Sequence, residues 1–174
     1  MVSAEDVLYI YRRLSDNGIQ TWLTGGWGID ALLGEQTRPH KDMDALLSLD
    51  DMVRMGELFS EDGYNRKKIW SENAWVLDRW GNKTATAFVL QDKAERQFDV
   101  HAMRLDENGN GVPAWTTLGD LVFMEKDLAG NGIIAGFPIK CITPKMQVTC
   151  HRGYELPDQH ILDLQRLHER FGVE

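Results

Sequence analysis

The sequence has few cysteines, no long apolar run and no excess of basic residues, and each shortage excludes a class of protein. Cys141 and Cys150 are its only cysteines, too few for a disulfide framework and not spaced as a Cys-x-x-Cys pair. No apolar run approaches the roughly 20 residues that cross a membrane. The acidic start, Met1 to Asp6, lacks the basic-then-apolar order of a signal peptide. We therefore expect a cytoplasmic protein with no membrane partner.

Length and charge indicate a small soluble domain that does not bind nucleic acid. The 174 residues, of which 43% are hydrophobic and 26% charged, suffice for one domain with at most a small appendage. Lys and Arg number 19 against 27 Asp and Glu, which gives a formal net charge of −8. Because bulk nucleic-acid binding takes its affinity from Lys and Arg on phosphates, we expect no nucleic-acid partner. The acidic balance is compatible with a neutral or cationic small molecule.

Helical and strand-like stretches follow one another without repeated βαβ units, which predicts an α+β fold. We expect a mixed or antiparallel sheet with flanking helices, divided into a domain over residues 1–142 and a small helical extension over residues 143–174. The expected helices cover the segment between Ser3 and Asn17 and residues 27–33, 51–61, 144–152 and 158–170. The expected strands cover residues 19–23, 43–49, 74–79, 84–91, 96–104 and 137–142.

Two acidic residues stand at the mouth of an apolar strand. Asp42 and Asp44 directly precede Ala45–Leu47, and alternate residues of a strand share a face. Neighbouring carboxylates repel each other unless a cation lies between them, although the pair alone also fits a solvated turn. Asp99, in the later stretch Gln97–His101, would face the same pocket if the two strands were adjacent. Three carboxylates from adjacent strands suit two Mg²⁺ ions that also bind substrate phosphates.

A glycine turn supplies a complementary feature for binding phosphate. Thr24-Gly25-Gly26 precedes the expected helix over residues 27–33. Glycines let the backbone approach a ligand closely, and the N–H groups at a helix N-terminus attract phosphate oxygens. Such a turn alone is more often structural, but its position about 16 residues before Asp-x-Asp is a much more specific combination.

These motifs resemble the signature of small antibiotic nucleotidyltransferases. The chain is similar to the lincosamide nucleotidyltransferases and the aminoglycoside 2''-nucleotidyltransferases of the polymerase-β-like superfamily, which implies the α+β polymerase-β-like fold. The similarity is weak over residues 50–95. The matching segments are Gly25–Gly34, Thr37–Asp44, Phe98–His101, Ile139–Thr143 and His151–Leu156.

The resemblance implies an enzyme that moves AMP from ATP onto a hydroxyl of a small-molecule acceptor. Asp42, Asp44 and Asp99 would bind the two Mg²⁺ ions, and Asp99 would also take the proton of the acceptor hydroxyl. Asp30 matches the motif without an assigned role. The candidate residues for binding the triphosphate or supporting its site are Gly25, Gly26, Arg38, His40, Lys140 and Lys145.

The implied acceptor is an antibiotic, and a lincosamide is favoured over an aminoglycoside. The segments Asp99–His101 and His151–Leu156 lean toward the lincosamide enzymes. Aminoglycosides carry several positive charges and need acidic pockets, whereas apolar walls, such as the tryptophans at positions 70, 75, 80 and 115, suit a lincosamide. An unrelated metabolite stays open. A homodimer that completes the acceptor pocket is compatible with the few helices of the C-terminal part.

Three other functions remain as alternatives. Gly26–Ala31 also fits the dinucleotide-binding pattern Gly-x-Gly-x-x-Ala, although the chain lacks alternating βαβ units. Together with Asp42 and Asp99, the side chains of His40 and His101 could form a zinc site in a hydrolase, although zinc favours His and Cys. A nucleotidyltransferase fold can also serve as a non-catalytic, antitoxin-like partner, but the loss of a metal-binding acid that would indicate this is not seen.

Overall fold

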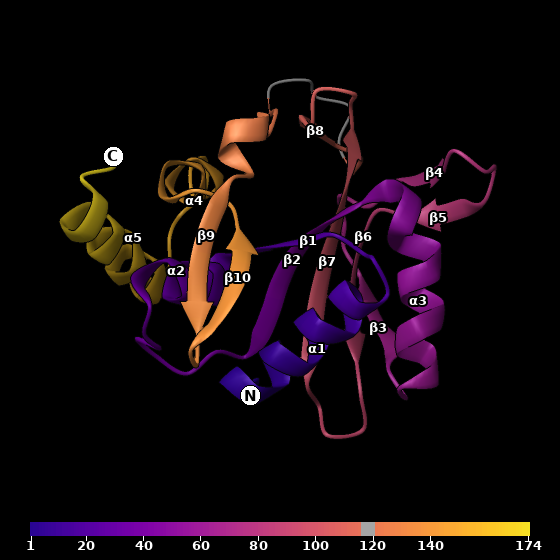
Figure 1. Ribbon diagram of the computed structural model, residues 1–174, viewed down its shortest axis with the longest axis horizontal. Helices are drawn as coiled ribbons and strands as arrows, with labels where there is room; N and C mark the ends of the chain where they lie inside the picture. The colour runs from indigo at the N-terminus through magenta and orange to yellow at the C-terminus, as the bar shows by residue number, and fades with distance from the viewer. Residues whose placement is uncertain (116–120) are drawn as a thin grey trace.

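The computed structural model describes residues 1–115 and 121–174 (Figure 1). Its helices are α1 (Ala4–Asp16), α2 (Gly25–Leu33), α3 (Met52–Glu61), α4 (Pro144–Cys150) and α5 (Asp158–Phe171). Its strands are β1 (Thr21–Thr24), β2 (Asp42–Ser48), β3 (Asn65–Ile69), β4 (Trp75–Leu77), β5 (Lys83–Ala85), β6 (Ala87–Gln91), β7 (Gln97–Leu105), β8 (Gly111–Pro113), β9 (Gly130–Ile134) and β10 (Phe137–Cys141).

A large mixed sheet forms the centre of the fold. Its strands follow the order β3-β6-β7-β2-β1-β10-β9, and β8 pairs with β7. The pairs β2–β7 and β1–β10 are parallel, and the other pairs are antiparallel. The strands β4 and β5 form a separate two-stranded hairpin, which projects beside α3 (Figure 1). The predicted α+β class is confirmed, and the β2–β7 pairing supplies the adjacency that the sequence left open.

The two faces of the sheet are covered unequally. One face packs against α1 and α3 and contributes Leu23, Leu47 and Val100 to the main hydrophobic core. Because strand side chains alternate, Trp22 and Leu46 point to the opposite face, where they form a smaller cluster near α4. This second face is the one on which the acidic residues of β2 and β7 project, so the fold leaves room there for a cavity.

Local sequence signals explain most helix boundaries. Ser3 caps α1 through a reciprocal capping box with Asp6, as the sequence predicts. The predicted turn at Thr24-Gly25-Gly26 is instead the first turn of α2, with Thr24 as the N-cap residue. Asp50, which precedes the helix expected over residues 51–61, does not cap α3; its carboxylate accepts hydrogen bonds from Arg79 instead.

The C-terminal helices pack against α2. Ile29 of α2, Val148 of α4 and Leu167 of α5 share a small apolar cluster. An ion pair between Arg38 and Asp163 adds a polar link to α5. The division at residues 142 and 143 stays a prediction. In the part of the chain that the structure describes, no helix has the length and apolarity needed to cross a membrane.

Candidate active site

Three aspartates from two neighbouring strands line one cavity. Asp44 of β2 is the direct register partner of Asp99 of β7, so their side chains project from the same face of the sheet. Asp42 lies two residues earlier on β2 and points the same way. All three line a cavity of about 1060 Å³, together with Gly25 and Gly26. The structure thus brings together the acids and the glycines that the sequence singled out.

The surroundings of Asp44 disfavour its negative charge. Burial raises the pKa of Asp44 well above its ordinary value, and the neighbouring Asp42 and Asp99 raise it further. The Arg38 guanidinium opposes this shift without cancelling it. A divalent cation would reverse this balance, because it supplies positive charge to carboxylates that otherwise repel one another.

Asp99 is oriented by aromatic and histidine neighbours. The Trp70 indole Nε1 donates a hydrogen bond to Oδ1 of Asp99 at 2.8 Å. Nδ1 of His101 lies 3.5 Å from the same oxygen. Burial raises the pKa of Asp99, and the contacts with His101 and Trp70 oppose that rise. The carboxylate is therefore held in one orientation toward the cavity.

The N-terminus of α2 approaches the acids as closely as side chains allow. A methyl group at Gly25 would overlap the Asp44 carboxylate, and one at Gly26 would overlap the His40 ring and the Arg38 guanidinium. Gly25 also has a φ of 58°, in the left-handed region that favours glycine. The two glycines are therefore needed to place the first turn of a helix, with its unpaired N–H groups, beside the carboxylates.

Asp30 explains how His40 is held at the cavity wall. Nε2 of His40 lies 2.5 Å from Oδ2 of Asp30, and both side chains are almost fully buried. Thr37 donates its hydroxyl to the other oxygen of Asp30 at 2.7 Å. The His40 ring also packs on Trp27, with ring centroids 4.8 Å apart. Asp30, which matches the motif without a predicted role, is thus the residue that orients His40.

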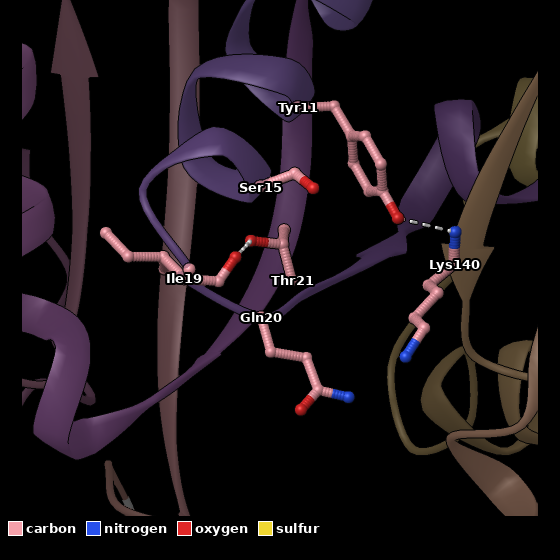
Figure 2. A pocket seen from close by; sticks show the side chains of 7 residues that line it. Tyr11, Ser15, Ile19, Gln20, Thr21 and Lys140 are labelled. Atoms are coloured by element: carbon pink, nitrogen blue, oxygen red, sulfur yellow. Dashed lines mark hydrogen bonds between the residues drawn. The ribbon is translucent and has the colours of Figure 1, made fainter.

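Lys140 and Lys145 are not among the described residues that line this cavity, and their role in binding the triphosphate stays a prediction. Lys140 lies on β10, where its backbone N–H donates to the Tyr11 hydroxyl at 3.0 Å, and its side chain extends beside Gln20 (Figure 2). Cys141, the next residue, is the register partner of Leu23 in β1. Lys140 therefore lies one residue before the level of Leu23, whereas the cavity begins beyond it, at Thr24. Lys145 is exposed, whereas the three residues that follow it in α4 are buried.

Two of the four candidate acceptor-site tryptophans line the cavity. Trp70 and Trp115 do so, whereas Trp75 and Trp80 are exposed elsewhere at 50% and 64%. The sequence did not identify Glu72, which lines the same cavity and lies 3.4 Å from Nε2 of His101. No periodic signal marked it, because it stands in an irregular segment between strands. The α4–α5 end of the cavity contributes His151, Tyr154 and His160.

The geometry disfavours the zinc and dinucleotide alternatives. Across residues 1–115 and 121–174, no group of three or more His, Cys, Asp or Glu side chains is arranged to hold a metal ion, and this includes the three aspartates as they stand. His40 is engaged by Asp30 and His101 lies beside Glu72, so the two histidines are held by different acids. The strands before and after α2 pair antiparallel, which is not the βαβ unit of a dinucleotide-binding fold.

Comparisons with known proteins agree with this geometry. The aminoglycoside-2''-adenylyltransferase family matches residues 6–167. A lincosamide resistance protein of Staphylococcus haemolyticus is 26% identical over 166 residues, which cover 95% of this chain and 94% of that protein.

Solved structures share the same fold. Lincomycin-bound lincosamide antibiotic adenylyltransferase LnuA has a TM-score of 0.79 at 24% identity, covering 95% of this chain and 96% of that chain. ANT(2'')-Ia in complex with adenylyl-2''-tobramycin has a TM-score of 0.66 at 16% identity, covering 97% and 89%. These similarities confirm the predicted polymerase-β-like fold.

Proposed function

Because the chain belongs to the aminoglycoside-2''-adenylyltransferase family and is a nucleotidyltransferase, we propose that it transfers AMP from ATP onto a hydroxyl of a lincosamide-type antibiotic. The observation that carries this proposal is the in-register pairing of Asp44 with Asp99 beside the first turn of α2. It supports a site where a triphosphate and an acceptor hydroxyl meet at a cluster of carboxylates.

The donor set fits Mg²⁺ by its chemistry. Asp42, Asp44 and Asp99 would hold the metal through carboxylate oxygens, and substrate phosphates and water would complete its coordination, as is usual for this ion. When bound, Mg²⁺ neutralises negative charge on the triphosphate and on the leaving pyrophosphate. The raised pKa of Asp44 supports this fit, since the Arg38 guanidinium does not cancel the effects of burial and of the neighbouring acids.

The reaction exchanges one phosphorus–oxygen bond for another. The acceptor hydroxyl oxygen attacks the α-phosphorus of ATP, the bond to the bridging oxygen breaks, and pyrophosphate leaves. Asp99 accepts the hydroxyl proton on its carboxylate, which Trp70 keeps aimed into the cavity. The N–H groups of Gly25 and Gly26 bind phosphate oxygens, and Arg38 and His40 lie beside them in the cavity wall.

The acceptor wall suits a molecule with apolar groups and one amine. Trp115, Leu46 and Phe123 provide apolar surface in the cavity. Among the described lining residues, Glu72 is the only acid other than the three motif aspartates, and it is 43% exposed. One further carboxylate matches the single amine of a lincosamide better than the several amines of an aminoglycoside.

An aminoglycoside is the second candidate acceptor, favoured by the description of the matching family. The two are separated by incubating the protein with ATP, Mg²⁺ and either lincomycin or tobramycin, and measuring the mass of the drug. We expect an AMP adduct on lincomycin. An adduct on tobramycin alone would overturn the choice of acceptor, and no adduct on either drug would overturn an antibiotic as the substrate.

A further inference from the structure

A buried ion pair joins the motif loop to the last helix. Nε and Nη2 of Arg38 lie 3.1 and 2.8 Å from Oδ2 of Asp163, and Nε lies 3.3 Å from Oδ1. The Asp163 side chain is 1% exposed, whereas that of Arg38 is 19% exposed. The two residues are 125 positions apart in the sequence, so only the packing of α5 brings them together. The Asp163 carboxylate is thus buried, whereas the Arg38 guanidinium remains accessible from the cavity that it lines.

The same guanidinium also lies beside the first turn of α2. A methyl group added at Gly26 would lie 2.8 Å from Nη2 of Arg38, so this nitrogen is packed directly against the first turn of α2. Nη1 donates to the carbonyl oxygen of Pro39 at 3.3 Å. Arg38 is thus bonded to Asp163 and to the Pro39 carbonyl and packed against the start of α2, and it has little freedom to turn away.

Desolvation of the Asp163 carboxylate argues against a purely structural role for this residue in packing α5. Asp163 and Leu167 are the buried residues of α5. Burying a carboxylate costs several kcal/mol before its partner compensates for it, and apolar residues in such places are often equally stabilising. Arg166 lies 3.5 Å from Oδ1 of Asp163, but it is a more exposed and more distant partner than Arg38. The ion pair therefore orients the Arg38 side chain more than it stabilises the packing of α5.

We propose that Asp163 is a positioning residue for the nucleotide donor, which fixes the Arg38 guanidinium beside the first turn of α2 where the β- and γ-phosphates bind. This inference rests on the proposed function, since the ligand it concerns is the triphosphate. A planar guanidinium binds a phosphate well only in a suitable orientation, and the carboxylate bonded to Nε and Nη2 sets that orientation.

Positioning and simple electrostatics predict opposite results for Asp163→Asn. Asp163 is itself negative, so its neutralisation alone would make the cavity more attractive to a triphosphate. If Asp163 acts by holding Arg38, the same substitution lets the guanidinium rotate and weakens triphosphate binding. The near-identical shape of Asn keeps the packing of α5, so the comparison isolates the charge and the strong hydrogen bonds.

The test is isothermal titration calorimetry of ATP and of AMP in the presence of Mg²⁺, without an acceptor. We expect Asp163→Asn to weaken ATP binding roughly 10- to 100-fold, the range seen when an orienting partner is lost. AMP binding should change much less, because AMP lacks the β- and γ-phosphates. Arg38→Lys keeps the positive charge but loses the forked donors of the guanidinium, so its loss of ATP affinity should resemble that of Asp163→Asn. The double variant Arg38→Gln/Asp163→Asn should bind ATP no more weakly than Arg38→Gln alone.

A matched control is available in another arginine–aspartate pair. Nε of Arg13 lies 2.8 Å from Oδ2 of Asp62, and Nη2 lies 3.1 Å from Oδ1, a similar fork that is not among the residues lining the cavity. Asp62→Asn should leave ATP binding unchanged.

The outcomes separate this inference from the proposed function. Unchanged or tighter ATP binding by Asp163→Asn would overturn the positioning role, as would additive losses in the double variant. Equal losses for ATP and AMP would also contradict it, since they would indicate general disruption. If the wild-type protein binds ATP but adenylylates neither drug, the proposed acceptor is wrong while the role of Asp163 stands. If it does not bind ATP, both fail.

Discussion

Asp44 and Asp99 face each other across the parallel pair β2–β7, in direct register. This relationship places two carboxylates from distant parts of the chain on one face of the sheet, next to a helix N-terminus that only glycines permit. Without a cation, the ionised Asp44 lowers the stability of the fold, because burial and the neighbouring acids both disfavour its charge.

Asp44→Asn should make the metal-free protein more stable at neutral pH while abolishing AMP transfer. The folded-state pKa of Asp44 is raised, so its contribution to stability is present below the unfolded pKa and is lost as pH rises through the folded pKa. Removing the charge therefore stabilises the fold at pH values above the folded pKa. Thermal unfolding in EDTA measures this, and the gain in Tm should shrink toward about pH 4. A lower Tm for Asp44→Asn at neutral pH would contradict this account.

Asp62→Asn should show the opposite dependence on pH. The hydrogen bond from Arg13 lowers the pKa of Asp62. Its contribution to stability is therefore present above the unfolded pKa and is lost as pH falls through the folded pKa. We expect Asp62→Asn to lower Tm at neutral pH, with the difference from wild type vanishing in acid. A difference in Tm that does not decrease as the pH falls through the acid range would show that the ionised pair is not its source.

Asp99→Asn should reduce kcat by about 10²- to 10⁴-fold, the usual contribution of a general base. ATP binding should change far less, because Asp42, Asp44 and the start of α2 remain in place. Steady-state kinetics and ATP titration together separate the two effects. Full activity in Asp99→Asn would remove this residue from the mechanism.

Gly26→Ala should weaken ATP binding by obstructing the turn, since the added methyl group overlaps the His40 ring and the Arg38 guanidinium. Gly56→Ala is the matched control: Gly56 lies inside α3, and an added methyl group meets nothing within 4 Å. The control should raise stability by roughly 0.5–1 kcal/mol through the higher helix propensity of alanine and leave ATP binding intact. Equal ATP affinity in both variants would argue against a phosphate site at this turn.

The sequence predicted those parts of the site that lie within one motif or on one regular strand. Asp42 and Asp44 share a strand face by simple alternation, and the glycines precede a helix with clear apolar residues. Strands β3 and β9 were missed because β3 is exposed along its whole length and β9 contains two glycines, so neither shows the usual alternation of apolar residues.

Contacts that arise only from tertiary packing could not be predicted from the sequence. Asp163 reaches Arg38 because α5 folds back onto α2, and no local pattern encodes that contact. Lys140 stood in a matching segment, but its place along β10 keeps it from the cavity. The predicted homodimer and the absence of a nucleic-acid partner stay predictions, and sedimentation of the protein alone and with RNA would test them.

We expect the chain to transfer a nucleotidyl group, rather than a phosphoryl group, onto a lincosamide. The most direct measurement is the stoichiometry of the products of wild-type protein with ATP, Mg²⁺ and lincomycin, with the drug followed by mass spectrometry and the phosphates by ³¹P NMR. The account predicts one pyrophosphate for each lincomycin that gains AMP, and neither product in EDTA. Formation of ADP with a phosphorylated drug, or a modified drug without pyrophosphate, would contradict it.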